Sequence, residues 1–108
     1  MDETKVQDTM NIILNAGDAR THIMHALDSL GDFDYQKAKD EMKLANEKLV
    51  VAHKLQTDRL QNEAEGEGVE YSVLFTHAQD TLMTIYSEYN ITKHLITVFE
   101  KRDAKEGK

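Results

Sequence analysis

The amino-acid sequence predicts an all-α fold, an antiparallel bundle of three long helices. Three observations lead to this prediction. The chain contains no proline, no segment sustains the alternation of apolar and polar residues that is typical of strands, and most glycines gather at two places. These places are Gly31 and the pair Gly66 and Gly68. Three helical segments with two short connections are typical of an antiparallel bundle.

The first helix is predicted to precede Gly31. Its apolar residues recur every three or four positions, which places them on one helical face. They are Val6, Met10, Ile13, Ala16, Ile23, Leu27 and Leu30. Arg20 interrupts this face where an apolar residue is due. The chain then turns through residues 31–34, where Gly31 can adopt the left-handed conformation and Asp34 can cap the next helix.

The second helix is predicted to begin near Asp34 and to carry the same apolar spacing. Its apolar face consists of Tyr35, Ala38, Met42, Ala45, Leu49 and Ala52. The face then meets the polar Gln56. The charged, glycine-bearing run from Asn62 to Gly68 buries nothing, so we predict a loop there.

The third helix is predicted to start after Ser72, a suitable N-cap residue. Its apolar face consists of Phe75, Ala78, Leu82, Ile85, Tyr89, Thr92, Ile96 and Phe99. We expect residues 1–108 to form one domain and residues 103–108 to be a disordered tail.

Further apolar residues lie outside these main faces. They are Ile12, Leu14, Leu44, Val50, Val73, Leu74, Ile91 and Val98. They could widen the core or form a second face for partner subunits. A single domain of 108 residues buries a smaller fraction of its surface than a large domain does. Oligomerisation is therefore the favoured interpretation.

Composition excludes several functional classes. The net charge of −7, with basic residues scattered among acidic ones, argues against nucleic-acid binding. The N-terminal MDETKVQDTM does not resemble a signal peptide, and no apolar run approaches the roughly 20 residues needed to span a bilayer. The absence of cysteine removes disulfides and thiolate metal sites. We therefore expect a cytoplasmic protein that does not insert into membranes.

A polar stripe interrupts the apolar pattern early in the third helix. His77, Asp80, Thr81 and Thr84 share one side of the helix, and Gln79 lies off to one flank. One interpretation is a half-exposed histidine with a carboxylate that the helix dipole favours. The other is a nucleophile, because neutral imidazole can attack a phosphoryl donor near pH 7. Thr81, Thr84 and Gln79 could then donate hydrogen bonds to the phosphoryl oxygens.

Asp80 does not fit phosphoryl transfer directly. A carboxylate one turn from a phosphorylated histidine repels the incoming negative charge. Asp80 could instead orient the imidazole, or it could bind a hard cation through its oxygens.

The remaining histidines give weaker signals. His22 and His25 are three positions apart in the first helix, His53 lies near the end of the second, and His94 lies far along the third. The chain has no Glu-x-x-His pair, so a di-iron carboxylate site is not indicated. Ordinary surface histidines are the default interpretation, and a histidine-rich transition-metal site is the alternative.

Five short motifs occur in order along the chain. They are IILNAGDAR (12–20), GDF (31–33), AHKLQT (52–57), EAEGE (63–67) and HAQDTLM (77–83). Through these motifs, the chain resembles the IIA component of one branch of the bacterial phosphoenolpyruvate-dependent sugar phosphotransferase system. This is the lactose/cellobiose, or N,N′-diacetylchitobiose, branch. The resemblance extends from about Val6 to about Arg102.

The resemblance implies a specific function and assembly. In that family, three-helix protomers form homotrimers, and the histidine of the HAQD motif, here His77, accepts phosphate from phospho-HPr and donates it to the sugar-specific IIB component. The aspartate, here Asp80, lies near the threefold axis, where three copies share a divalent cation usually taken as Mg²⁺. The membrane component IIC selects the sugar, so lactose, cellobiose, chitobiose and related β-glucosides all stay open.

One residue departs from the family pattern. Many members read HAQDHLM, whereas this chain has Thr81 in place of the second histidine. A hydroxyl therefore replaces any help from that imidazole. Two alternatives stay open, a two-component histidine phosphotransfer domain and a non-catalytic helical interaction module. The first typically has a lysine and a glycine in the turn after its histidine, whereas this chain has Gln79, Asp80 and Thr81.

Overall fold

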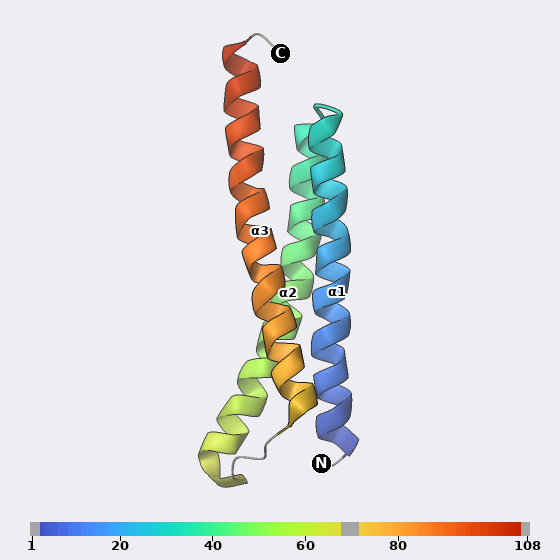
Figure 1. The fold of residues 1–108 in the computed structure, drawn as a ribbon, viewed down its shortest axis with the longest axis vertical. Helices are drawn as coiled ribbons and strands as arrows, with labels where there is room; N and C mark the ends of the chain where they lie inside the picture. Colours follow the sequence, from blue (N-terminus) through green and yellow to red (C-terminus); the bar gives the residue numbers. More distant parts are fainter. Residues whose placement is uncertain (1–2, 68–71, 107–108) are drawn as a thin grey trace.

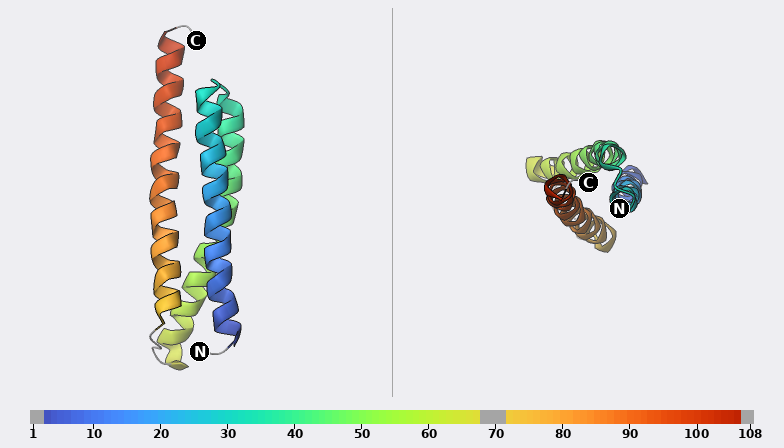
Figure 2. Two further views of the ribbon diagram at one scale, coloured as in Figure 1. Left: turned by 45° about the vertical axis from the view of Figure 1, so that its right-hand side comes forward. Right: turned by 90° about the horizontal axis from the view of Figure 1, so that it is seen from above.

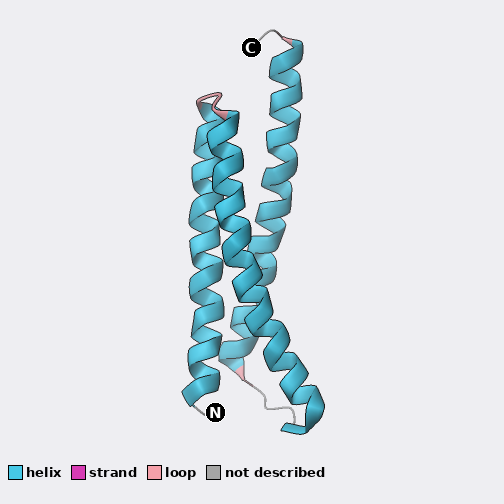
Figure 3. Cartoon of the chain, turned by 180° about the vertical axis from the view of Figure 1, so that it is seen from behind, coloured by secondary structure: helices cyan, strands magenta, loops and turns pink. Residues whose placement is uncertain are grey.

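The computed structural model describes residues 3–67 and 72–106. It contains three long α-helices, α1 (Glu3–Gly31), α2 (Tyr35–Asn62) and α3 (Val73–Lys105), and a short π-helix, η1 (Glu63–Glu67), that continues α2 (Figure 1). Within these two described stretches no strand occurs, as Figure 3 shows. The predicted all-α, three-helix fold is confirmed.

The three helices form an elongated rod. α1 and α2 are antiparallel and make the most extensive contact, whereas α2 and α3 make the least (Figures 1 and 2). The rod measures 59 × 19 × 18 Å, and its radius of gyration of 17.1 Å exceeds the roughly 13 Å of a compact chain of this length. Only the last turn of α3, beyond Glu100, which pairs with Lys39, extends past the other two helices (Figure 1). None of the described helices is long and apolar enough to cross a membrane.

The core of α2 and α3 matches the predicted apolar faces. Tyr35 and Tyr89 are partly buried, and Phe99, near the end of the bundle, is exposed. The other predicted residues of both faces are buried. On the solvent side, most of the extra apolar residues are exposed, including Leu14, Val73 and Ile91.

The predicted face of α1 is confirmed in part. Ala16 and Ile23 are buried as expected, and Met10 is exposed. The other predicted residues, Val6, Ile13, Leu27 and Leu30, are partly buried. The other buried residues of α1 are Thr9, Ile12, Ala19, Ala26 and Ser29. Alanines bury little apolar area each but let two helices pack closely, and the hydroxyls of Thr9 and Ser29 donate to helix carbonyls one turn earlier. Small residues therefore pack beside the large buried side chains of Ile12 and Ile23 and shift the centre of this face from the predicted one.

The turn between α1 and α2 is built differently from the prediction. α1 includes Gly31, and the left-handed residue is Phe33, with φ of 60°. The amides of Phe33 and Asp34 donate to the carbonyls of Leu30 and Ser29, the pattern of a Schellman motif. Asp34 caps α2 as predicted, its Oδ1 accepting from the Lys37 amide at 3.1 Å.

The conformation of Phe33 leads to a stability prediction. A side chain at a left-handed position costs roughly 1 to 2 kcal/mol, which glycine avoids. Since the Phe33 side chain is 58% exposed, we expect Phe33→Gly to have a free energy of unfolding about 1 kcal/mol above that of Phe33→Ala. Chemical denaturation of the two variants at equal protein concentration measures this difference. Equal stabilities, or a more stable alanine variant, would show that no strain is stored there.

Two predicted irregular segments are helical instead. Residues 62–67 of the predicted loop form the end of α2 and η1, because Glu-Ala-Glu favours a helix and the Glu63 amide bonds to the carbonyls of Arg59 and Leu60. Gly68 lies outside the described residues. The predicted disordered tail is helical as far as Lys105, where Arg102 and Lys105 complement the helix dipole. Residues 107–108 are not described.

Candidate functional site

The start of α3 is fixed by local hydrogen bonds. The Ser72 hydroxyl accepts from the Phe75 amide at 3.1 Å, and the Ser72 carbonyl accepts from the amide and the hydroxyl of Thr76. Ser72 is thus the N-cap, as the sequence predicts. These bonds determine where α3 begins and hence the direction in which His77, the fifth residue of α3, points.

His77 is exposed on the flank of α3 that borders α1. At about 100° per residue, His77, Thr81, Thr84 and Glu88 fall within about 60° of one another around the helix. Glu88 marks the contact with α1, because its two carboxylate oxygens accept from Arg20 Nε and Nη2 at 2.8 and 3.0 Å. His77 and Thr84 are exposed, and Thr81 is half-buried. The structure therefore brings both predicted hydroxyl donors onto the face of His77.

The Arg20–Glu88 pair explains the break in the apolar face of α1. The hydrogen bond to Glu88, aided by its charge, raises the pKa of the Arg20 guanidinium, and desolvation opposes this only in part. The bidentate geometry keeps Arg20 on Glu88. Since Glu88 lies three turns beyond His77 on α3, Arg20 serves to dock α3 on α1.

Gln79 does not share the face of His77. It lies about 160° around the helix from His77, on the flank of Tyr86, and is half-buried. Its amide is therefore not placed to donate to a group on His77 of the same chain.

Asp80 lies on the outer face of α3. It is exposed, and within residues 3–67 and 72–106 its carboxylate makes no hydrogen bond or ion pair. Three exposed apolar residues, Val73, Ile91 and Val98, lie within about 40° of it around the helix. Asp80 does not contact His77 in the protomer, so it does not orient that imidazole there.

Arg59 is a buried residue that supports the start of α3, and the sequence did not single it out. It is only 6% exposed. Its Nη1 donates to Thr9 Oγ1 of α1 at 2.7 Å, its Nε donates to Glu63 at 3.4 Å, and its guanidinium lies 4.1 Å from the Phe75 ring centroid. Arg59 thus ties the first turn of α3 to both other helices. Arg59 lies seven residues after Ala52, in step with the apolar spacing of α2, and this position could have indicated that it is buried.

Gln56 lines a groove between α2 and α3. The groove has a volume of about 470 Å³ and is lined by His53, Gln56, Leu82, Met83 and Tyr86. Gln56 Oε1 is buried and accepts no hydrogen bond from the described residues. The His53 and Tyr86 rings meet edge to face, with centroids 6.1 Å apart. Burial raises the pKa of Tyr86, as does the neighbouring Tyr89.

Comparison with known proteins decides the family. The family model described as "PTS system, Lactose/Cellobiose specific IIA subunit" matches residues 7–100. The chain belongs to this family. The lactose-specific EIIA component of Staphylococcus epidermidis is 41% identical over 90 residues, which cover 83% of this chain and 86% of that protein. The lichenan-specific IIA component of Bacillus subtilis is 35% identical over 107 residues, covering 99% and 97%.

Solved structures of this IIA family have the same fold. The cellobiose-specific enzyme IIA from Bacillus anthracis superimposes with a TM-score of 0.89 at 37% identity, covering 97% of this chain and 96% of that one. PtcA from S. mutans gives a TM-score of 0.87 at 32% identity, covering 93% and 99%. The chain is a phosphoryl-carrying component of a sugar phosphotransferase system, and the sequence-based assignment is confirmed.

Proposed function

We propose that His77 is the residue that carries the phosphoryl group, accepting it from phospho-HPr and passing it to IIB. The observation that carries this proposal is the position of His77, an exposed imidazole held by a capped helix start with Thr81 and Thr84 on the same face. An exposed imidazole can meet two different partner proteins in turn. Thr81, where many members have histidine, supplies a hydroxyl donor.

The chemistry requires only one nucleophile and suitable donors. The unprotonated nitrogen of the His77 imidazole attacks phosphorus, a nitrogen–phosphorus bond forms, and the bond to the donor group of phospho-HPr breaks. The leaving group takes up the proton that the imidazole loses. Hydroxyls such as those of Thr81 and Thr84 stabilise the charge on the phosphoryl oxygens. Transfer to IIB is the reverse step with a new acceptor.

The protomer supports assembly as a homotrimer through α3. Its exposed surface of 6931 Å² exceeds the roughly 6,100 Å² typical of a compact monomer of this mass. The outer stripe of Val73, Asp80, Ile91 and Val98 follows the seven-residue repeat by which helices pack against copies of themselves. In such a trimer, the three Asp80 side chains converge.

Asp80 suits a shared divalent cation such as Mg²⁺. Its carboxylate is exposed and is not engaged by any described side chain, and carboxylate oxygens are the ligands that hard cations prefer. Three like charges brought together without a counter-ion would repel one another. The cation, when bound, neutralises this charge, and Asp80 holds it at the subunit contact.

Chelation tests the role of Asp80. We expect EDTA to lower the thermal stability of the wild-type trimer and Mg²⁺ to restore it, because the cation offsets the repulsion of three carboxylates. Asp80→Asn removes those charges, so its stability should no longer respond to either reagent. Thermal unfolding with metal analysis measures both effects. A wild type that binds no divalent cation and ignores EDTA would refute this role.

Ile91→Glu tests the assembly, and Leu14→Glu is its matched control. A charge at Ile91, in the middle of the outer stripe, should yield monomers by light scattering. The same charge at Leu14, on the exposed surface of α1, should leave the trimer intact. A trimeric Ile91→Glu variant would show that the stripe is not the interface.

The charge of the chain supports phospho-HPr as the proposed donor. The net charge of −7 suits a donor that presents a positive face, as HPr proteins do, and favours fast, transient encounters. Because these exchanges take place in the cytoplasm, we place the protein there. The relatives are named for lactose, lichenan and cellobiose, which fits sugar selection by IIC. We propose a sugar of this β-glycoside group.

The relay itself tests the proposal. The chain is incubated with phosphoenolpyruvate, enzyme I and HPr, purified, and then mixed with IIB. Phosphate that passes from the chain to IIB supports the carrier role. A chain that accepts phosphate but cannot deliver it to IIB would refute the proposed direction of transfer.

A further inference from the structure

Two histidines and a glutamate lie close together in the half of the α1–α2 pair that is nearer the turn joining these helices. His22 and His25 come from successive turns of α1, and Glu41 comes from α2. His22 Nδ1 lies 2.7 Å from Glu41 Oε2, and His25 Nδ1 lies 3.7 Å from the same oxygen. The potential ligand atoms of all three residues lie within 4.8 Å of one another.

These distances are close to those of a zinc site. Two atoms bound to one tetrahedral Zn²⁺ lie roughly 3.3 Å apart, given metal–ligand distances of about 2.0 to 2.1 Å. The two nitrogen–oxygen distances bracket this value, so small rotations of the side chains would bring the ligands into place. Two imidazoles and a carboxylate are also a ligand set that Zn²⁺ uses with water in the fourth position.

The surroundings favour a cation and leave a route to solvent. The side chain of Glu41 is 17% exposed and that of His22 is 26% exposed, whereas His25 is 53% exposed. The cluster opens onto a cavity of about 360 Å³ that is also lined by Asp28, Asp32 and Lys37. Two carboxylates against one ammonium give this cavity a negative balance.

A simple ion pair explains only part of this arrangement. The hydrogen bond between His22 and Glu41 satisfies those two side chains without a metal. It gives no reason for His25 to direct its Nδ1 at the same oxygen, with its ring edge to face against His22 at a centroid distance of 6.2 Å. A metal ion accounts for the approach of all three.

We propose that His22, His25 and Glu41 bind one transition-metal ion of the zinc type. The ion links α1 to α2 and so stabilises the helical pair against which α3 packs. The site is independent of His77. The Arg20–Glu88 pair puts Arg20 of α1 level with Glu88 of α3, which lies three turns beyond His77. His22 lies just beyond Arg20, so it is roughly 20 Å from His77 along the bundle axis. The site also differs from the one proposed at Asp80, where the ligand atoms are carboxylate oxygens without any histidine nitrogen.

Zinc titration of the full chain tests the site. The His77→Ala variant serves as the background, so that the phosphocarrier histidine takes no part, and excess Mg²⁺ is present to occupy oxygen-only sites. Isothermal titration calorimetry should show one Zn²⁺ per chain. On this background, His22→Ala and His25→Ala should each weaken zinc binding at least tenfold, and His53→Ala should leave it unchanged.

Thermal unfolding supplies a second readout. Saturating Zn²⁺ should raise the melting temperature of the background variant, because the ion binds only the folded helical pair, and His25→Ala should abolish this rise. Absence of saturable binding, or an equal effect of His53→Ala and His25→Ala, would overturn the proposal. Neither result depends on whether His77 carries phosphate.

Discussion

Alanine in place of His77 is expected to abolish phosphoryl transfer from phospho-HPr to IIB through this protein. The rate should fall on the order of 10³-fold or more, because removing a nucleophile removes the step itself. The side chain is exposed and packs in no core, so the fold and the melting temperature should be preserved. Sugar phosphorylation in the reconstituted system measures the loss.

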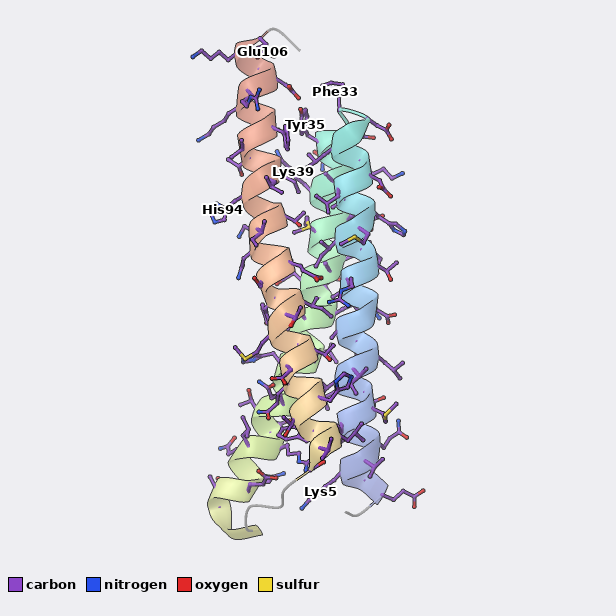
Figure 4. The ribbon with its side chains drawn as sticks, viewed as in Figure 1. Lys5, Phe33, Tyr35, Lys39, His94 and Glu106 are labelled. Carbon is purple, nitrogen blue, oxygen red and sulfur yellow. The ribbon has the colours of Figure 1, made fainter. Side chains whose placement is uncertain are left out.

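His53→Ala is the matched control for this variant. His53 is exposed on α2, whereas His94 points away from the bundle beside Asp80 and Ile91 on the outer stripe of α3 (Figure 4) and would not be neutral. His53→Ala should leave transfer at the wild-type rate. Full activity of His77→Ala would contradict the assignment of the carrier, and an equal loss in both variants would indicate a general effect of removing a histidine.

Arg59→Ala is expected to lower the free energy of unfolding by about 3 kcal/mol. The substitution removes the contact with the Phe75 ring and leaves the carboxylate of Glu63, whose side chain is only 10% exposed, without its ion-pair partner. It also removes the hydrogen bond to Thr9. Because these contacts join the start of α3 to α1 and α2, we also expect slower phosphoryl transfer at His77. Chemical denaturation measures the first effect.

Two further variants separate the contributions at Arg59. In Arg59→Ala/Glu63→Gln, the unpaired charge is gone, so part of the lost stability should return. Lys54→Ala removes an exposed ion pair with Asp58 on the same helix and should change stability by less than about 1 kcal/mol. If Arg59→Ala were as mild as Lys54→Ala, Arg59 would not anchor the start of α3.

The fold was predictable wherever large apolar residues define the buried face. α2 and α3 follow this rule, so their faces were found from spacing alone. α1 follows it only in part, because Ala19, Ala26 and the hydroxyl residues Thr9 and Ser29 share its contact with Ile12 and Ile23. The turn also escaped prediction, since Gly31 offered the easier left-handed residue but Phe33 occupies that position.

The sequence predicted which of the candidate site residues share a helical face, but not their roles. Helical spacing alone placed His77, Thr81 and Thr84 on one side of α3, and the structure keeps them there. It could not reveal Arg59, because a long charged side chain at a buried position reads as a surface residue until its partners are known. The convergence of Glu41 on His22 and His25 likewise depends on how α1 and α2 pair.

Intact-mass spectrometry is the most direct test of the central claim. Wild-type protein and His77→Ala are incubated in parallel with phosphoenolpyruvate, enzyme I and HPr. Our account predicts one acid-labile phosphoryl group on each wild-type chain, as expected of a phosphohistidine, and none on the variant. A phosphoryl group on His77→Ala, or none on the wild type, would contradict it.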